Sequence, residues 1–407
     1  MLAALEDGVK GDVWFSLIDK VYAMPNLRAA YAEVKANRGG AGVDHQSLEM
    51  FGANLEENLR RLSESLRNGT YRPQAIRRTY IPKPGKKELR PLGIPTVRDR
   101  VAQAALRHVL EPIFERDFAE HSYGFRPGRS CKDALRRVTV LLEQGYTWVV
   151  DADLKSYFDT IPHGRLMDRV QAKVADGRVL GLIEAYLKQE VTETARTWTP
   201  DKGSPQGAVL SPLLSNIYLD PLDHAMAEAG YEMMRYADDF VVLCRSEAEA
   251  RAALERVRRW TAQAGLTLHP DKTRIVDATQ RGGFDFLGYH FERGYRWPGR
   301  KSLAKVRDAI RAKTRRTSGH SLSQIIQNVN RTLRGWFEYF KHSRPYTFAK
   351  MDGWVRMRLR SILRRRQRRR GRGRGRDHQR WPNFFFAEHG LFSLSAAYEA
   401  ARQSLHG

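Results

Sequence analysis

Two short segments of this chain place carboxylates within runs that otherwise indicate buried strands. In MMRYADDFVVL, Asp238 and Asp239 stand side by side between apolar residues. In YTWVVDADL, alternation along a strand puts Asp151 and Asp153 on one face. An isolated Asp-Asp pair most often lies in a solvated turn, but the apolar flanks indicate strands on both sides of this one.

Carboxylates this close together favour a bound metal. Two of them about 4 Å apart repel by roughly 4 kcal/mol at an effective dielectric of about 20, so a fold retains such a cluster mainly when cations neutralise it. If the two acidic segments are neighbouring strands, they can hold two Mg²⁺ ions about 3.5–4 Å apart, an arrangement that serves phosphoryl transfer. The spacing therefore predicts metal-assisted phosphoryl-transfer chemistry.

The elements that must position these acids follow from periodicity and turn residues. Apolar residues recur at helical spacing over 47–66 and, after a capping box that starts at Ser246, over 246–265. Residues 70–96 contain five prolines and two glycines, and their alternation around a basic turn predicts a β-hairpin with a cationic tip. Strands mixed with helices around the acids indicate an α+β domain built on an antiparallel sheet.

Positive charge is concentrated towards the carboxyl end of the chain. Of the formal net charge of +24, +22 falls within residues 300–380, which hold 26 Lys or Arg against four acids. Such a segment repels itself unless it lies against a polyanion. Nucleic acid is favoured over an anionic membrane, because no sustained apolar face adjoins the arginines. For the run 364–376, which has nine arginines in thirteen residues, a solvated tail is the alternative.

Helices are also expected in this basic segment. A capping box and apolar residues at helical spacing predict a helix over 321–340, and a second helix is expected over 346–370. Trp336, Phe337 and Phe340 are expected to form helix core rather than to stack on bases.

Composition excludes several classes of protein. Cys131 and Cys244 are far apart and in no CxxC pattern, which argues against a disulfide scaffold or a cysteine zinc site and fits a reducing cytoplasm. Glu6 and Asp7 lie in the first apolar stretch, and no basic segment precedes it, so no leader peptide is expected. Every apolar stretch is interrupted before about 18 residues, so no membrane span is expected.

Seven motifs in the family order together resemble a reverse transcriptase. They are RPLGIPTVRDR (90–100), SYGFRPGRS (122–130), DADLKSYFDTI (151–161), GSPQG (203–207), YADD (236–239), HPDKT (269–273) and FDFLGY (284–289). The first two, with LRGWFEYF at 333–340, narrow the resemblance to bacterial group II intron reverse transcriptase/maturases. The resemblance extends over most of the chain.

The resemblance implies an α+β fold of the right-hand polymerase type. Helical and β fingers, with the start of the palm, would occupy residues 1–145. An antiparallel-sheet palm with a ferredoxin-like core and the active site would occupy 146–295, and a basic helical thumb or maturase domain 296–407. Because only 27 residues follow Arg380, the chain resembles the members that lack an endonuclease domain.

The resemblance assigns a catalytic metal triad of Asp153, Asp238 and Asp239. This triad would bind two Mg²⁺ ions, with Mn²⁺ as a substitute. Of the two adjacent aspartates, Asp238 rather than Asp239 is the expected full ligand. The family spacing to Phe158 selects Asp153 and leaves Asp151 a structural role. In the implied mechanism one ion activates the primer 3′-hydroxyl, and both stabilise the pentacoordinate phosphate and the leaving pyrophosphate.

Three further residues match positions around the nucleotide in this family. Phe158 resembles the steric gate, a ring that leaves no room for a 2′-hydroxyl and so favours dNTPs, and ordinary core packing is its alternative. Gln206 matches the residue that contacts the incoming nucleotide, and the adjacent glycine permits close backbone approach. Lys272 matches a proton donor to the leaving pyrophosphate.

Two cations of the hairpin complete the implied site. Lys83 and Arg90 match the fingers residues that clamp the triphosphate. Seven positions separate them, one more than the family pattern, so Lys86 or Lys87 is the alternative to Lys83.

The resemblance implies an RNA-directed DNA polymerase encoded by a group II intron, which also binds its intron RNA as a maturase to assist splicing. It would support retrohoming by target-primed reverse transcription from pre-existing DNA 3′ ends. The expected partners are group II intron RNA, an RNA template, a DNA primer or target DNA, and dNTPs, with no membrane. The expected location is the bacterial cytoplasm, with nucleoid association.

Two other functions stay open at this point. The first is a retron-like or defence-associated reverse transcriptase, against which the long segment with RGWFEYF argues. The second is an RNA-binding maturase without polymerase activity, which the intact Asp153, Asp238, Asp239 and Gln206 disfavour. An RNA-dependent RNA polymerase is disfavoured by Phe158 and YADD.

Overall fold

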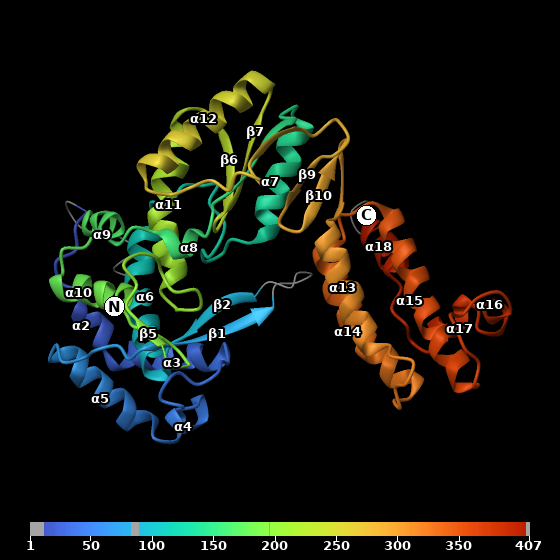
Figure 1. Cartoon of the computed structure of the whole chain (residues 1–407), viewed down its shortest axis with the longest axis horizontal. Helices are drawn as coiled ribbons and strands as arrows, with labels where there is room; N and C mark the ends of the chain where they lie inside the picture. The colour runs from blue at the N-terminus through green and yellow to red at the C-terminus, as the bar shows by residue number, and fades with distance from the viewer. Residues whose placement is uncertain (1–11, 83–88, 195, 404–407) are drawn as a thin grey trace. The chain divides into compact units, whose positions relative to one another are not determined.

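The computed structural model describes residues 12–82, 89–194 and 196–403, and the chain divides into two units between Ile275 and Val276 (Figure 1). The first unit contains the acidic segments, and the second contains the arginine-rich one. The domain limits predicted after residues 145 and 295 stay predictions.

Helices and two sheets make up the first unit. The helices are α2 (Ile18–Tyr22), α3 (Met24–Ala36), α4 (Leu48–Ala53), α5 (Leu55–Arg67), α6 (Val97–Glu115), α7 (Cys131–Glu143), α8 (Tyr157–Thr160), α9 (His163–Gln171), α10 (Gly177–Leu187), α11 (Ser211–Glu228) and α12 (Glu247–Gln263). One sheet has the order β2-β1-β4-β5, with β1 (Ile76–Pro82), β2 (Leu89–Ile94), β4 (Val191–Glu193) and β5 (Arg196–Trp198). The other has the order β6-β7-β3-β8, with β3 (Trp148–Asp153), β6 (Glu232–Tyr236), β7 (Asp239–Cys244) and β8 (Arg274–Asp277), and the division between the units falls within β8.

The second unit combines a small sheet with helices. The sheet has the order β11-β10-β9, with β9 (Phe284–Phe286), β10 (Tyr289–Glu292) and β11 (Tyr295–Pro298). The helices are α13 (Arg300–Lys313), α14 (Leu322–Phe340), α15 (Pro345–Arg366), α16 (Arg376–Arg380), α17 (Asn383–Glu388) and α18 (Leu394–Gln403). Helices and largely antiparallel sheets confirm the prediction of an α+β fold.

The sheet with the acidic segments is covered on both faces. Val150 and Ala152 of β3 and Phe240 and Val242 of β7 belong to the main apolar core, which also takes in α11 and α12. Helix α7 packs against β6 and β7, and Figure 1 shows it on the side opposite α12. Strand alternation therefore turns the acids of β3 away from the main core.

Most of the predicted helices are found, and two differ in extent. The helix predicted over 346–370 is α15, which ends at Arg366, four residues earlier than predicted. The helix predicted over 47–66 is interrupted at Asn54, whose φ of −122° and ψ of 45° are not helical, so α4 and α5 are separate. The predicted helix after Ser246 is α12, and the Ser246 hydroxyl accepts from the Glu249 amide at 3.2 Å. Local capping chemistry therefore placed this helix start correctly.

The second unit has its own apolar core along α14. Helix α14 begins at the predicted capping box of Ser321 and Gln324. Trp336, Phe337 and Phe340 are buried, which confirms that they form helix core. Of the residues that the structure describes, none belongs to a helix long and apolar enough to cross a membrane.

Candidate active site

Strand pairing brings the two acidic segments together. Strands β3 and β7 are antiparallel neighbours, and Asp153 lies directly opposite Asp239 in their register. Residues paired in this way point to the same face with Cβ atoms about 4.5–5.5 Å apart. Asp238 lies in the turn between β6 and β7, immediately before Asp239. The three predicted metal ligands therefore meet at one end of the sheet.

The crowding of these carboxylates disfavours their ionised forms. Burial, with the charges of Asp151, Asp238 and Asp153, raises the pKa of Asp239 to about 7. Burial raises the pKa of Asp238 as well, and the charge of Asp153 adds to that effect, while Arg90 and Lys272 oppose it. A site that raises carboxyl pKa values in this way favours uptake of a proton or a cation.

Two cations from the HPDKTR segment lie against β3. The Lys272 ammonium donates to an Asp153 carboxylate oxygen, and Arg274 pairs with Asp151 at 3.2 Å. The backbone holds this segment in place, because the His269 amide donates to the Asp153 carbonyl at 2.7 Å. Lys272 is thus at the site where the sequence predicted it.

All the ligand atoms offered here are carboxylate oxygens, the donors that Mg²⁺ prefers. As the side chains stand, no set of three or more His, Cys, Asp or Glu residues in the described ranges has the geometry to hold a metal. At Asp153 a carboxylate oxygen is already taken by the Lys272 ammonium. The donor set therefore fits a hard divalent cation, with Lys272 as its competitor at Asp153.

The GSPQG loop connects the acids to the hairpin. Its Ser204 amide donates to the Phe158 carbonyl at 2.7 Å, and the Gln206 carbonyl accepts from the Gly93 amide of β2 at 2.7 Å. Gly207 has φ of +103°, and a Cβ there would lie 2.5 Å from the Gly93 carbonyl oxygen. Only glycine fits this approach, so the loop is held between α8 and β2.

Of the remaining predicted residues, Phe158 and Arg90 lie in the part of the chain that the structure describes, and Lys83 does not. Phe158 of α8 is half-buried against the main core, with its ring 5.4 Å from that of Tyr157. Arg90 is exposed on β2, opposite Ile81, and its charge acts on Asp238. Lys83, like its alternatives Lys86 and Lys87, lies outside the described residues.

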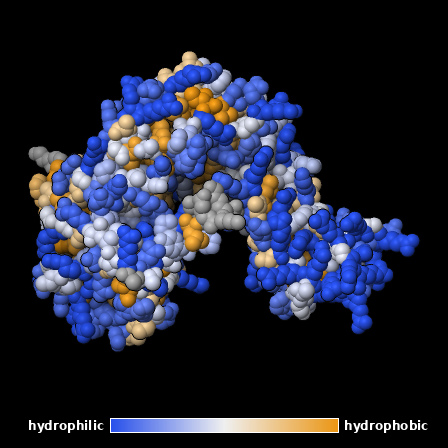
Figure 2. Space-filling model, in the orientation of Figure 1, coloured by the Kyte–Doolittle hydropathy of each residue, from blue (hydrophilic) through white to orange (hydrophobic). Residues whose placement is uncertain are grey.

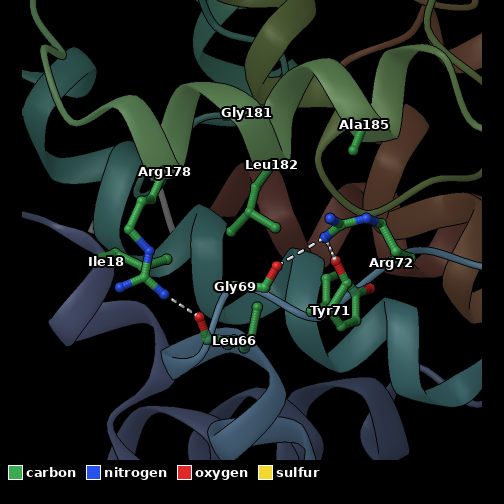
Figure 3. Close-up of a pocket in the computed structure, with 9 residues that line it drawn as sticks. All are labelled: Ile18, Leu66, Gly69, Tyr71, Arg72, Arg178, Gly181, Leu182 and Ala185. Carbon is green, nitrogen blue, oxygen red and sulfur yellow. Dashed lines mark hydrogen bonds between the residues drawn. The ribbon is translucent and has the colours of Figure 1, made fainter.

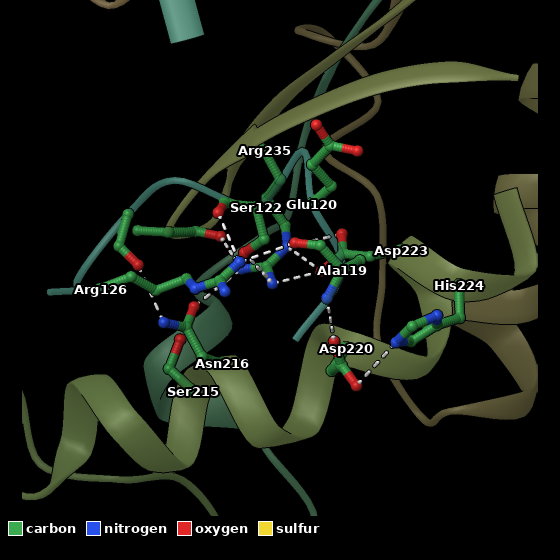
Figure 4. Close-up of polar contacts among 12 residues, drawn as sticks. Ala119, Glu120, Ser122, Arg126, Ser215, Asn216, Asp220, Asp223, His224 and Arg235 are labelled. Atoms are coloured by element: carbon green, nitrogen blue, oxygen red, sulfur yellow. Dashed lines mark hydrogen bonds and ion pairs between the residues drawn. The ribbon is translucent and has the colours of Figure 1, made fainter. Parts of the chain in front are cut away.

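A buried arginine, Arg235, holds the turn that carries Asp238, and the sequence reasoning missed it. The Arg235 side chain has no exposed surface, and its Nε donates to both Asp223 carboxylate oxygens at 2.8 and 2.9 Å (Figure 4). Its Nη1 donates to the Asn216 side-chain oxygen and the Ala237 carbonyl, each at 2.9 Å, and its Nη2 to the Ser122 hydroxyl at 2.8 Å. A signal was present, because an arginine in an apolar strand is almost never buried without a partner.

The SYGFRPGRS loop packs directly against the same turn. The Tyr123 amide donates to the Arg235 carbonyl at 2.8 Å. A Cβ on Gly124 would lie 2.2 Å from the Ala237 nitrogen, and Ala237 itself has φ of +60°. Arg126 holds the loop from within by donating to the Ser122 carbonyl at 2.9 Å and to Glu115. The SYGFRPGRS loop therefore packs against the turn that carries Asp238 and supports it.

The raised pKa of Asp239 predicts a pH-dependent stability in the absence of divalent metal. An unfolded aspartate has a pKa of about 3.9, so between about pH 4 and 7 the folded chain keeps a proton that the unfolded chain has lost. Stability from this group therefore falls as pH rises to about 7 and is constant above it. In EDTA, Asp239→Asn should be more stable than wild type by up to about 4 kcal/mol at pH 8 and equally stable near pH 4.

Urea unfolding at both pH values measures this difference. Addition of Mg²⁺ at pH 8 should stabilise the wild type more than the variant. An equal response of both proteins to pH and to Mg²⁺ would contradict the pKa and the role of Asp239 in holding a cation.

The chain is similar to known proteins. Residues 81–291 match the family described as reverse transcriptase (RNA-dependent DNA polymerase), and residues 303–381 match the group II intron, maturase-specific domain. Protein YkfC of Escherichia coli (strain K12) is 35% identical over 316 residues, which cover 67% of this chain and 82% of that protein.

A second relative and one solved structure are also similar. The group II intron-encoded protein LtrA of Lactococcus lactis subsp. cremoris is 41% identical over 197 residues, 48% of this chain and 32% of that protein. The match thus spans about a third of LtrA. Telomerase from Candida albicans superposes with a TM-score of 0.44 and 12% identity over 78% of this chain and 64% of that chain.

Proposed function

Since this chain belongs to the reverse transcriptase family and carries the maturase-specific domain of group II intron proteins, we propose that it copies an RNA template into DNA at the acidic end of β3 and β7. The observation that carries the proposal is the opposition of Asp153 and Asp239 across the strand pair, with Asp238 in the adjoining turn. Nucleotide binding is assigned to the surrounding loop and hairpin, which the backbone bonds of Gln206 and Phe158 connect to the site.

Asp153, Asp238 and Asp239 would hold two Mg²⁺ ions. When bound, these ions would lower the pKa of the primer 3′-hydroxyl and neutralise the charge that develops on the phosphate. Lys272, whose ammonium lies beside Asp153, would protonate the leaving pyrophosphate. Arg90 carries a positive charge on the exposed face of β2 and would bind the triphosphate.

Primer extension tests this function directly. The purified protein should extend a DNA primer on an RNA template when Mg²⁺ and dNTPs are supplied. Loss of extension in EDTA and its recovery with Mg²⁺ are expected. Failure to extend with any divalent metal, by a protein that binds the primer–template, would favour the maturase without polymerase activity.

Selectivity for dNTPs is expected to depend on Phe158. Its ring is held against Tyr157 and the core, so it cannot move aside for a 2′-hydroxyl without a cost in packing. Phe158→Ala should raise the use of NTPs relative to dNTPs by roughly tenfold or more. The measurement is the ratio of kcat/KM values for dCTP and CTP on one template.

Phe158→Tyr keeps the ring and serves as the matched control, since it should retain the selectivity for dNTPs. An unchanged ratio in Phe158→Ala would mean that the ring has only a packing role.

The second unit is proposed to bind intron RNA and so to assist splicing. The maturase-specific domain covers most of the basic segment, and Figure 2 shows mainly hydrophilic side chains over α15 to α17 on the visible face. Within the described residues, the Arg365, Arg368 and Arg372 side chains are exposed and take part in no hydrogen bond or ion pair. They are available to phosphates.

Affinity for intron RNA should therefore fall steeply with salt. For single strands each phosphate contact adds about 0.7 to the slope of log affinity against log salt. Replacing Arg365, Arg368 and Arg372 with Gln should make that slope shallower by about 2. Filter binding between about 50 and 200 mM salt measures it. A near-flat dependence for the wild type would contradict phosphate binding by this segment.

The same proposal includes priming from a target DNA 3′ end. It also includes residence in the bacterial cytoplasm, because the template, the primer and the dNTPs are found there.

A further inference from the structure

Among the cavities outside the candidate active site, two differ in how their arginines are bonded. The first, of about 320 Å³, lies between α5 and α10 (Figure 3). Its Arg72 donates to the Gly69 and Tyr71 carbonyls, at 2.9 and 2.7 Å, and its Arg178 donates to the Leu66 and Arg67 carbonyls. Both guanidinium groups therefore already have backbone carbonyls as partners and are not left for a ligand.

The second cavity, of about 650 Å³, lies within the second unit, between β11, α13 and the start of α15. Trp297 and Tyr346 supply aromatic surface, and Tyr346 is 72% exposed. Met351 is among the apolar residues beneath them. A volume of this size is typical of sites for small molecules or for single groups of a larger ligand.

Three cations line the same cavity. They are Arg307, Arg344 and Lys350. The Lys350 ammonium lies 5.6 Å from the centre of the Tyr346 ring, and the Arg344 guanidinium lies 3.3 Å from the centre of the Tyr295 ring. No acid lines the cavity, and within the described ranges none of the three cations forms an ion pair.

Arg307 is partly exposed and forms no hydrogen bond among the described residues. Its guanidinium group lies 6.0 Å from the centre of the Trp354 ring. Its neighbour Asp308 bonds instead to Arg311, and Asp352 of α15 bonds to the segment at Ser393. The nearby carboxylates are therefore engaged elsewhere, and the donors of the cavity are left for an anionic ligand.

We propose that this cavity binds one unpaired nucleotide of RNA, with its base against Tyr346 and Trp297 and its phosphate at Arg307, Arg344 and Lys350. The inference rests on the proposed RNA binding of the second unit. A base in a continuous helix is stacked and unavailable, whereas a bulged or looped base can enter an aromatic site. Three cations without acids exclude an apolar peptide as the better occupant.

The test compares two RNA hairpins that differ in one bulged nucleotide, 2-aminopurine. The wild type is expected to bind the bulged hairpin roughly tenfold more tightly than the fully paired one, measured by anisotropy. Stacking should also quench the fluorescence of 2-aminopurine. Tyr346→Ala and Trp297→Leu are expected to lose both the preference and the quenching, while affinity for the paired hairpin is retained.

Phe384→Ala is the matched control, because Phe384 is 64% exposed in the same unit and does not line the cavity. It should keep the preference. Thermal melts establish that all three variants fold.

The two proposals fail in different ways. A wild type that binds neither hairpin contradicts the proposed RNA binding of the second unit. A wild type that binds both hairpins equally, or cavity variants that keep the tenfold preference, would overturn the nucleotide site and leave RNA binding intact.

Discussion

Replacing Asp238 with asparagine is expected to reduce primer extension by about 10³-fold or more, the loss associated with removal of a group that stabilises transition-state charge. Asparagine keeps the size of the side chain but cannot supply the negative charge that holds Mg²⁺. The fold should survive, because the pKa of Asp238 is raised by burial and by Asp153, so removing its charge relieves repulsion. Asp238→Asn should therefore unfold at the same or a higher urea concentration than the wild type.

Asp151→Asn is the control within the same cluster. Asp151 shares the face of Asp153 but lies opposite Val241 and pairs with Arg274. The sequence predicted a structural role, and less than about tenfold loss of extension fits it. An equal loss in both variants would indicate that Asp151 is also a metal ligand. Extension by Asp238→Asn at the wild-type rate would contradict the assignment of the active site.

Removal of Arg235 is expected to have the second large effect. Arg235→Met leaves the Asp223 carboxylate buried without its partner, so the free energy of unfolding should fall by about 3–5 kcal/mol. Extension should fall as well, by roughly 100-fold, because the turn before Asp238 loses its bond to the Ala237 carbonyl and a displacement of about 1 Å can cost that much. The loss should appear in kcat more than in KM.

A double variant separates stability from positioning. Arg235→Met with Asp223→Leu removes both charges, and most of the stability should return, since a buried ion pair can be replaced by apolar groups at little cost. Activity should stay low, because the bonds to Ala237, Asn216 and Ser122 remain absent. Recovery of both stability and kcat in the double variant would show that Arg235 has no positioning role.

Local patterns in the sequence were sufficient for several elements of this fold. Alternation identified β3 with Asp151 and Asp153 on one face, and capping residues identified the starts of α12 and α14. These features depend on residues within a few positions of one another, so the printed sequence contains all the information they need. The exception at Asn54 is also local, because a single non-helical residue divides an otherwise periodic stretch.

The site depended on contacts between distant segments. The register that sets Asp153 opposite Asp239, and the bond from Lys272 to Asp153, join residues far apart in the chain, and only folding decides such pairings. Resemblance to a family supplied the identities of these residues from motif order, without their contacts.

Arg235 shows the same division most clearly. The sequence shows an arginine before YADD in an apolar strand, and such a residue needs a partner if it is buried. Its burial and its partners Asp223, Asn216 and Ser122 are known from the folded chain, because the partners come from α11 and from the SYGFRPGRS loop. A buried charge requires partners, but its own neighbours in the chain cannot specify which ones the fold will bring to it.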